Sequence, residues 1–167
     1  MYRKGHYGVA LLVFAPVGFS LVRAGAPDLA FLTGAIMLSF AMLPDVDLRV
    51  PLLTHRGATH TLAFGALVGG AFALVASLAG EALGLSPGGV LGRVGLAGFG
   101  FAVGALTVGA HLLADVLTPS GVALFWPLSR RRYTLSLAPA RSPVANYVLF
   151  AVGIGAVAAA TWLAVTL

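Results

Sequence analysis

Five long apolar stretches, separated by short polar segments, constrain the fold of this chain more than any other feature. They cover residues 7–22, 29–43, 62–79, 94–117 and 144–167. Only 9% of the 167 residues are charged, against about 25% in an ordinary soluble domain. Each stretch therefore predicts a transmembrane helix. We expect a single all-α integral-membrane domain, residues 1–167, that forms a polytopic helical bundle of about five spans.

The second stretch is short. Its fifteen residues reach about 22 Å, whereas the hydrocarbon core of a bilayer is about 30 Å thick. We expect it to cross with local thinning or to re-enter on the side where it began. Proline and glycine mark the connections between the stretches, including Ser86-Pro87-Gly88-Gly89 before the fourth one.

Basic residues are distributed unevenly between the two predicted membrane faces. With five crossings, only Arg23 and Arg93 fall on the second face, and eight basic residues fall on the first: Arg3, Lys4, Arg49, Arg56, Arg130, Arg131, Arg132 and Arg141. The positive-inside rule then predicts a cytoplasmic N-terminus. The rule also accounts for the net charge of +5, so we do not expect a nucleic-acid partner.

Seven histidine and aspartate residues from three regions of the sequence are predicted to reach that first, cytoplasmic face. With no cysteine in the chain, a metal ion would have to be held by imidazole and carboxylate groups. The candidate metal ligands are His6, Asp45, Asp47, His55, His60, His111 and Asp115.

His111 and Asp115 are four residues apart near the end of an apolar helix, so they share one helix face. Asp45 and Asp47 follow Pro44, where an extended segment would point both carboxylates the same way. The alternatives are an interfacial His–Asp hydrogen bond for the first pair and a solvated polar turn for the second.

The segment from His55 to Thr61 holds two imidazoles and a guanidinium on a glycine-containing loop. His55 and His60 are five residues apart, so both reach one centre only if a loop runs into a helix there. Thr59 or Thr61 can cap that helix, and Arg56 can bind an anion such as phosphate. The alternative for Arg56 is an arginine that faces lipid headgroups. His6 could likewise be only interfacial.

Histidine and aspartate ligands suit zinc, manganese or iron(II), and seven candidates exceed one tetrahedral site. We expect two or three divalent ions, zinc first and manganese as the alternative. Such a centre activates water for phosphoester hydrolysis. Motifs of phosphate loops, serine hydrolases and zincins do not occur in the sequence.

At these residues the chain resembles the YdjM-type family of inner-membrane metal-dependent hydrolases. The ordered pattern consists of His6, Leu43-Pro44-Asp45-Val46-Asp47, His55-Arg56-Gly57-x-Thr59-His60, His111-Leu112-Leu113-x-Asp115, Leu117-Thr118 and Trp126-Pro127. The family is in turn distantly similar to zinc-dependent phospholipases C and single-strand-specific zinc nucleases. The resemblance implies a metal-dependent hydrolase in the inner membrane of a prokaryote.

We therefore expect a phosphoesterase that acts on a membrane lipid, either a phospholipid or an isoprenoid phosphate, at the cytoplasmic face. The predicted catalytic residues are Asp45, Asp47, Arg56 and Asp115, and the predicted substrate-binding residues are Arg56, Thr59, Arg130, Arg131, Arg132 and Arg141. Two alternatives stay open: a divalent-metal transporter or sensor, and a non-catalytic scaffold in which metal fastens short helices together. The sequence leaves the oligomeric state open.

Overall fold

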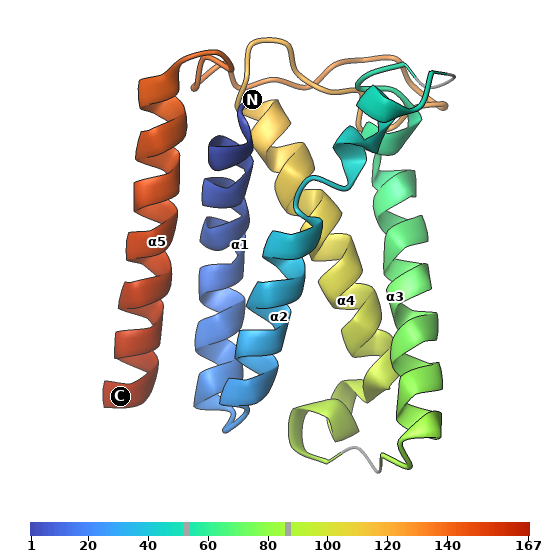
Figure 1. Ribbon diagram of the computed structural model, residues 1–167, viewed down its shortest axis with the longest axis vertical. Helices are drawn as coiled ribbons and strands as arrows, with labels where there is room; N and C mark the ends of the chain where they lie inside the picture. Colours follow the sequence, from blue (N-terminus) through green and yellow to red (C-terminus); the bar gives the residue numbers. More distant parts are fainter. Residues whose placement is uncertain (52–53, 86–87) are drawn as a thin grey trace.

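A computed structural model describes residues 1–51, 54–85 and 88–167 of the chain. Its α-helices run roughly alongside one another (Figure 1). They are α1 (Arg3–Arg23), α2 (Pro27–Phe40), α3 (Leu62–Ala82), α4 (Gly89–Val116) and α5 (Pro143–Thr166). The predicted all-α fold is confirmed, and five helices are long and apolar enough to cross a membrane. Ser86 and Pro87, in the predicted third connection, lie outside the described residues.

The second span combines two kinds of helix. The α2 helix has 14 residues and is followed by the 3₁₀ helix η1, Pro44–Arg49. The 14 residues of α2 reach about 21 Å at about 1.5 Å per residue. The longer segment Pro27–Arg49, with 23 residues, has the length and hydropathy of a membrane span, and in it η1 follows α2 after a turn at residues 41–43.

Glycine allows the helices to approach each other closely. A Cβ atom added at Gly8 of α1 would lie 2.5 Å from the Leu149 carbonyl of α5, and one added at Gly100 of α4 would lie 2.5 Å from the Phe72 carbonyl of α3. Any larger side chain at either position would force the helix pair apart. Small residues thus allow close packing in both helix pairs, as is common for helices in a bilayer.

One end of the bundle carries most of the irregular structure. Helices α1, α3 and α5 begin there and α2 and α4 end there, at the top of Figure 1. The 3₁₀ helices η1 and η2 (Ala58–His60) lie at the same end.

The segment between α4 and α5 folds back over the end of α4. Leu135 N donates to Val116 O at 2.7 Å, and Ala138 N donates to Leu117 O at 3.0 Å. An isolated antiparallel bridge joins Val122 to Tyr133. These contacts fix the end of α4 that carries His111 and Asp115.

Candidate metal centre

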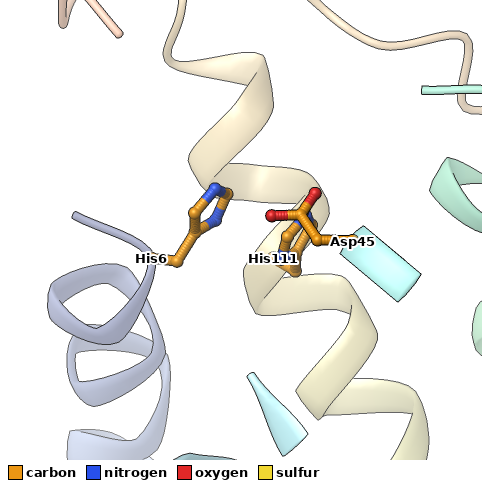
Figure 2. Close-up of side chains that lie close together, drawn as sticks. All are labelled: His6, Asp45 and His111. Carbon is orange, nitrogen blue, oxygen red and sulfur yellow. The ribbon is translucent and has the colours of Figure 1, made fainter. Parts of the chain in front are cut away.

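All seven predicted ligand residues gather at the irregular end of the bundle. They come from α1 (His6), η1 (Asp45 and Asp47), the loop before η2 (His55), η2 itself (His60) and α4 (His111 and Asp115). Figure 2 shows His6, Asp45 and His111 close together, with the Asp45 carboxylate lying over the His111 ring in this view. Three overlapping groups of these residues could each hold an ion: His6 with Asp45 and His111, Asp45 with His55 and His60, and His60 with His111 and Asp115.

Four side-chain atoms converge most closely. His60 Nε2 lies 3.2 Å from His111 Nε2. Asp45 Oδ1 lies 3.3 Å from His60 Nε2 and 3.5 Å from His111 Nε2. Asp115 Oδ2 lies 3.4 Å from His60 Nε2 and 3.7 Å from His111 Nε2. We call these four residues the central cluster.

The separations of the Asp45 and Asp115 oxygens from the two Nε2 atoms are close to those between neighbouring ligands of one tetrahedral ion. Bonds of about 2.0–2.1 Å in a tetrahedron place neighbouring ligand atoms about 3.3 Å apart, and the five separations run from 3.2 to 3.7 Å. Asp115 Oδ2 is buried and has no hydrogen-bond partner among the described residues. A buried carboxylate oxygen is costly without a partner, and a cation between these atoms would supply one.

Both histidines of the cluster are oriented through their other ring nitrogen. His111 Nδ1 lies 2.8 Å from the Ala41 carbonyl oxygen, which can only accept a hydrogen bond, so Nδ1 carries the proton. His60 Nδ1 lies 3.0 Å from Thr59 Oγ1, its hydrogen-bond partner, and 3.2 Å from Asp47 Oδ2; the Thr59 hydroxyl already donates to Asp47, so it accepts from Nδ1. A proton on Nδ1 leaves the Nε2 lone pair free, as in most metal-bound histidines. The two Nε2 atoms therefore face each other as acceptors.

Asp47 is held by the protein through both carboxylate oxygens. Its Oδ1 lies 3.1 Å from His55 Nδ1. Its Oδ2 accepts from the Arg56 backbone N–H and from Thr59 Oγ1, both at 3.0 Å. This arrangement suits a residue that orients His60 and the loop before it.

The extended conformation predicted for Asp45 and Asp47 is wrong. Pro44–Arg49 form the 3₁₀ helix η1, which proline at its first position favours. The two carboxylates consequently approach opposite nitrogens of the same imidazole, Asp45 at Nε2 and Asp47 at Nδ1 of His60.

Arg56 holds the Asp115 carboxylate from the other side. Its Nη2 donates to Asp115 Oδ1 at 2.7 Å, and its Nη1 donates to the Gly121 carbonyl at 3.1 Å. Its backbone φ is 58°, a left-handed conformation that arginine rarely adopts. Such strain persists where several contacts hold a residue in place, and here those contacts fix one oxygen of Asp115.

His6 and His55 lie at the edges of the cluster. The His6 ring stacks on His111 with centroids 4.0 Å apart, and its Nδ1 is buried without a hydrogen-bond partner among the described residues. His55 contacts the ring of His60 edge to face, with centroids 5.3 Å apart, and its side chain is 44% exposed. The predicted loop that runs into a helix is present, and Thr61 caps α3 by accepting from Phe64 N.

The predicted substrate-binding residues occupy several environments. Thr59 is buried against Asp47 and His60. The four arginines of the connection before α5 are exposed: Arg130, Arg131, Arg132 and Arg141. Arg130 and Arg132 line a cavity of about 330 Å³ together with His55 and Arg56, whereas Arg131 lies over the Tyr133 ring. Their role in binding a substrate stays a prediction.

Several contributors to the site were not predicted from the sequence. The Ala41 carbonyl fixes the proton position on His111, and Thr118 Oγ1 accepts from Arg56 at 3.4 Å. The Met1 amino group lies 3.9 Å from Asp115 Oδ1, and burial lowers its pKa. Of these contributors, only Thr118 had a signal in the sequence, because Leu117-Thr118 is part of the family pattern.

The fold and the site together define a polytopic membrane protein with a buried histidine–aspartate cluster at one end of its helices. The chain belongs to the YdjM inner membrane protein family, whose sequence model matches residues 1–167. Searches of curated proteins and of solved structures found no match. The distant similarity to zinc phospholipases C and zinc nucleases stays a prediction.

Proposed function

We propose that this protein is a metal-dependent hydrolase that cleaves a phosphoester of a membrane lipid. The observation that carries the proposal is the convergence of Asp45 Oδ1 and Asp115 Oδ2 on the paired Nε2 atoms of His60 and His111, each oxygen 3.3 to 3.7 Å from each nitrogen. Two imidazole nitrogens and two carboxylate oxygens suit zinc, with manganese as the alternative.

A divalent ion at this position would lower the pKa of water and stabilise the charge that develops on a phosphoester. Among the four central residues, Asp45 is best placed to accept the proton of the attacking water, through Oδ2, the oxygen that does not converge on the two Nε2 atoms. Its side chain is 16% exposed, whereas those of His60, His111 and Asp115 are 0 to 2% exposed. Water and a phosphoester would yield a phosphate and an alcohol, and the proton held by Asp45 would return to the leaving oxygen.

We propose further that the site can hold a second ion beside the central one. His6 and His55 each belong to a group of three residues that shares Asp45 with the central cluster. A second ion beside the central one would draw on either of them. Asp47 would act by orienting His60, because both of its oxygens already accept hydrogen bonds from the protein.

The position of the site supports a membrane lipid as the partner. The central cluster lies at the end of helices that are long and apolar enough to cross a membrane, which is where a lipid presents its headgroup. Eight basic residues belong to this end, and the positive-inside rule supports its location at the cytoplasmic face. The exposed arginines 130–132 and Arg141 would attract anionic headgroups, at about 1 kcal/mol each.

The experiment is a phosphate-release assay on the purified protein in mild detergent, with phosphatidic acid and an isoprenoid phosphate as substrates. We expect turnover with zinc or manganese, loss of turnover with a chelator, and loss in His60→Ala. Turnover that survives both the chelator and His60→Ala would contradict the proposal. Bound metal that raises the melting temperature without any turnover would favour the metal-fastened scaffold.

A transporter or sensor has less support from the arrangement of polar groups. The acids Asp28 and Glu81 are exposed, in the first turn of α2 and the last turn of α3. Neither belongs to a group that could hold a metal among the described residues. Stepwise binding sites across the bilayer, which an ion path requires, are therefore not indicated by the described helices.

A further inference from the structure

A large cavity adjoins the central cluster on the side of α1, η1 and α5. Its volume is about 1030 Å³, at the upper end of the range of about 300–1,000 Å³ for small-molecule sites. Asp45 belongs to both the cavity wall and the central cluster. The lining residues that the argument uses are Arg3, Lys4, Phe40, Asp45, Leu48 and Arg49.

The cavity wall is positively charged. Three basic residues, Arg3, Lys4 and Arg49, line it, and Asp45 is the acidic residue among its lining residues. Arg3 and Pro143 are the first residues of α1 and α5 and also lie in this wall. Helix N-termini carry partial positive charge, so they add to the charge of the side chains. An anion would be attracted to this cavity.

The basic side chains differ in how they are held. Lys4 Nζ donates to the Tyr147 hydroxyl and lies 3.9 Å from the centroid of that ring, which fixes it against α5. Among the residues that the structure describes, the Arg3 and Arg49 side chains make no hydrogen bond or ion pair, and both residues are exposed. Their guanidinium groups are available for two-point contacts with a phosphate.

The same cavity has an apolar wall. Phe40 at the end of α2 is 42% exposed, and Leu48 of η1 is 65% exposed. An apolar surface beside basic side chains matches a ligand that is partly hydrocarbon and partly anionic. Free phosphate would use only the basic part of the cavity.

We propose that this cavity binds the phosphate headgroup of an anionic lipid, with Arg3 and Arg49 on the phosphate and the first part of the lipid chains against Phe40 and Leu48. The inference rests on the proposed function in one respect. Because Asp45 belongs to both the cavity wall and the central cluster, a headgroup bound in the cavity would lie at the edge of the metal centre. Lipid binding itself needs no metal, so it can be measured separately.

The experiment is isothermal titration calorimetry of the full chain in mild detergent with a chelator present. The probes are dioctanoyl phosphatidic acid, dioctanoylglycerol with the same chains and no phosphate, and inorganic phosphate. We expect phosphatidic acid to bind more tightly than either of the other two. Loss of one charged phosphate contact lowers affinity by about tenfold, so we expect this loss in Arg49→Gln and a larger one when Arg3→Gln is added.

One variant tests whether the cavity or the overall surface charge binds the lipid. Arg23→Gln removes an exposed charge at the other end of α1, far from the cavity wall, and should leave the affinity unchanged. An equal loss in Arg23→Gln and Arg49→Gln would overturn the proposal, as would inorganic phosphate that binds as tightly as the lipid.

A second measurement uses the unaltered chain, in case the variants fold poorly. A phosphatidic acid with a photoreactive group near the top of its chain should label peptides that contain Phe40 or Leu48. Labelling confined to other helices would overturn the cavity assignment. If lipid binds as expected but metal analysis finds no ion, the lipid site stands and the proposed hydrolase fails.

Discussion

In the proposed metal centre, Asp47→Asn tests whether Asp47 orients the ligand His60 or is itself a ligand. Asp47 Oδ2 lies 3.2 Å from His60 Nδ1 and accepts from Arg56 N and Thr59 Oγ1 at 3.0 Å. Asparagine has nearly the same shape and can keep an oxygen at this position. What it loses is the negative charge that holds the proton on His60 Nδ1.

The expected magnitude follows from that loss of charge. The Thr59 hydroxyl, which hydrogen-bonds His60 Nδ1, in turn donates to Asp47. Hydrogen bonds to charged groups contribute about 1.5–3 kcal/mol and neutral ones about 0.5–1.5 kcal/mol, so a neutral residue at position 47 should make a difference of about 1.3 kcal/mol. This difference corresponds to about a tenfold weaker metal affinity, and changes behind a metal-bound histidine typically cost about 10–100-fold. Asp45→Ala should instead remove one of the four converging atoms and abolish tight binding.

The assay is competition for zinc between the purified protein and a fluorescent chelator of known affinity. Asp28→Asn, at an exposed acid in the first turn of α2, is the matched control and should bind zinc as the unaltered chain does. If Asp47→Asn loses zinc as completely as Asp45→Ala, Asp47 is itself a ligand. If its affinity is unchanged, the orienting role is refuted.

Three further predictions concern stability, measured as thermal unfolding in detergent by circular dichroism. Arg56→Gln should cost about 3–5 kcal/mol because it leaves the buried Asp115 carboxylate without its 2.7 Å ion pair; a cost similar to that of Arg131→Gln would contradict this. Gly8→Leu should lower the melting temperature because the leucine side chain would meet the Leu149 backbone. Gly155→Leu is the control and should not lower it, since open space surrounds Gly155. Equal effects of the two substitutions would argue against the close α1–α5 contact. Thr61→Ala should cost about 1 kcal/mol by removing the cap on Phe64 N, and Thr61→Ser should restore most of it; failure of the serine to do so would point to the lost methyl group.

The number and approximate limits of the membrane spans could be predicted from the sequence because hydropathy and length are local properties. The shared face of His111 and Asp115 follows in the same way from helical spacing. The cap at Thr61 was also predictable, since threonine precedes an apolar helical run there.

The conformation of η1 and the role of Asp47 could not be predicted in this way. Proline at position 44 was compatible with an extended segment, but the chain must bring Asp45 and Asp47 to opposite nitrogens of His60. Asp47 also accepts its hydrogen bonds from residues 8, 9 and 12 positions later. These residues belong to a loop and a 3₁₀ turn without a regular sequence period, so the contacts could not be predicted.

The large cavity beside α1, η1 and α5 could not be predicted from the sequence for a different reason. Arg3, Lys4 and Arg49 were fully explained as a topology signal, because the positive-inside rule concerns side of the membrane and not position on that side. Only the packing of α1 beside η1 and α5 brings them to one cavity. Similarly, no sequence pattern predicts that the His6 ring stacks on His111.

The central claim is that His60, His111, Asp45 and Asp115 hold a divalent metal ion. The most direct test is elemental analysis of the protein purified in mild detergent without added metal, beside His60→Ala, Asp115→Ala and the control Asp28→Asn. We predict at least one zinc or manganese ion per chain in the unaltered protein and the control, and loss of the ion in the other two variants. Absence of metal from the unaltered protein, even after zinc is supplied and the excess removed, would contradict the account.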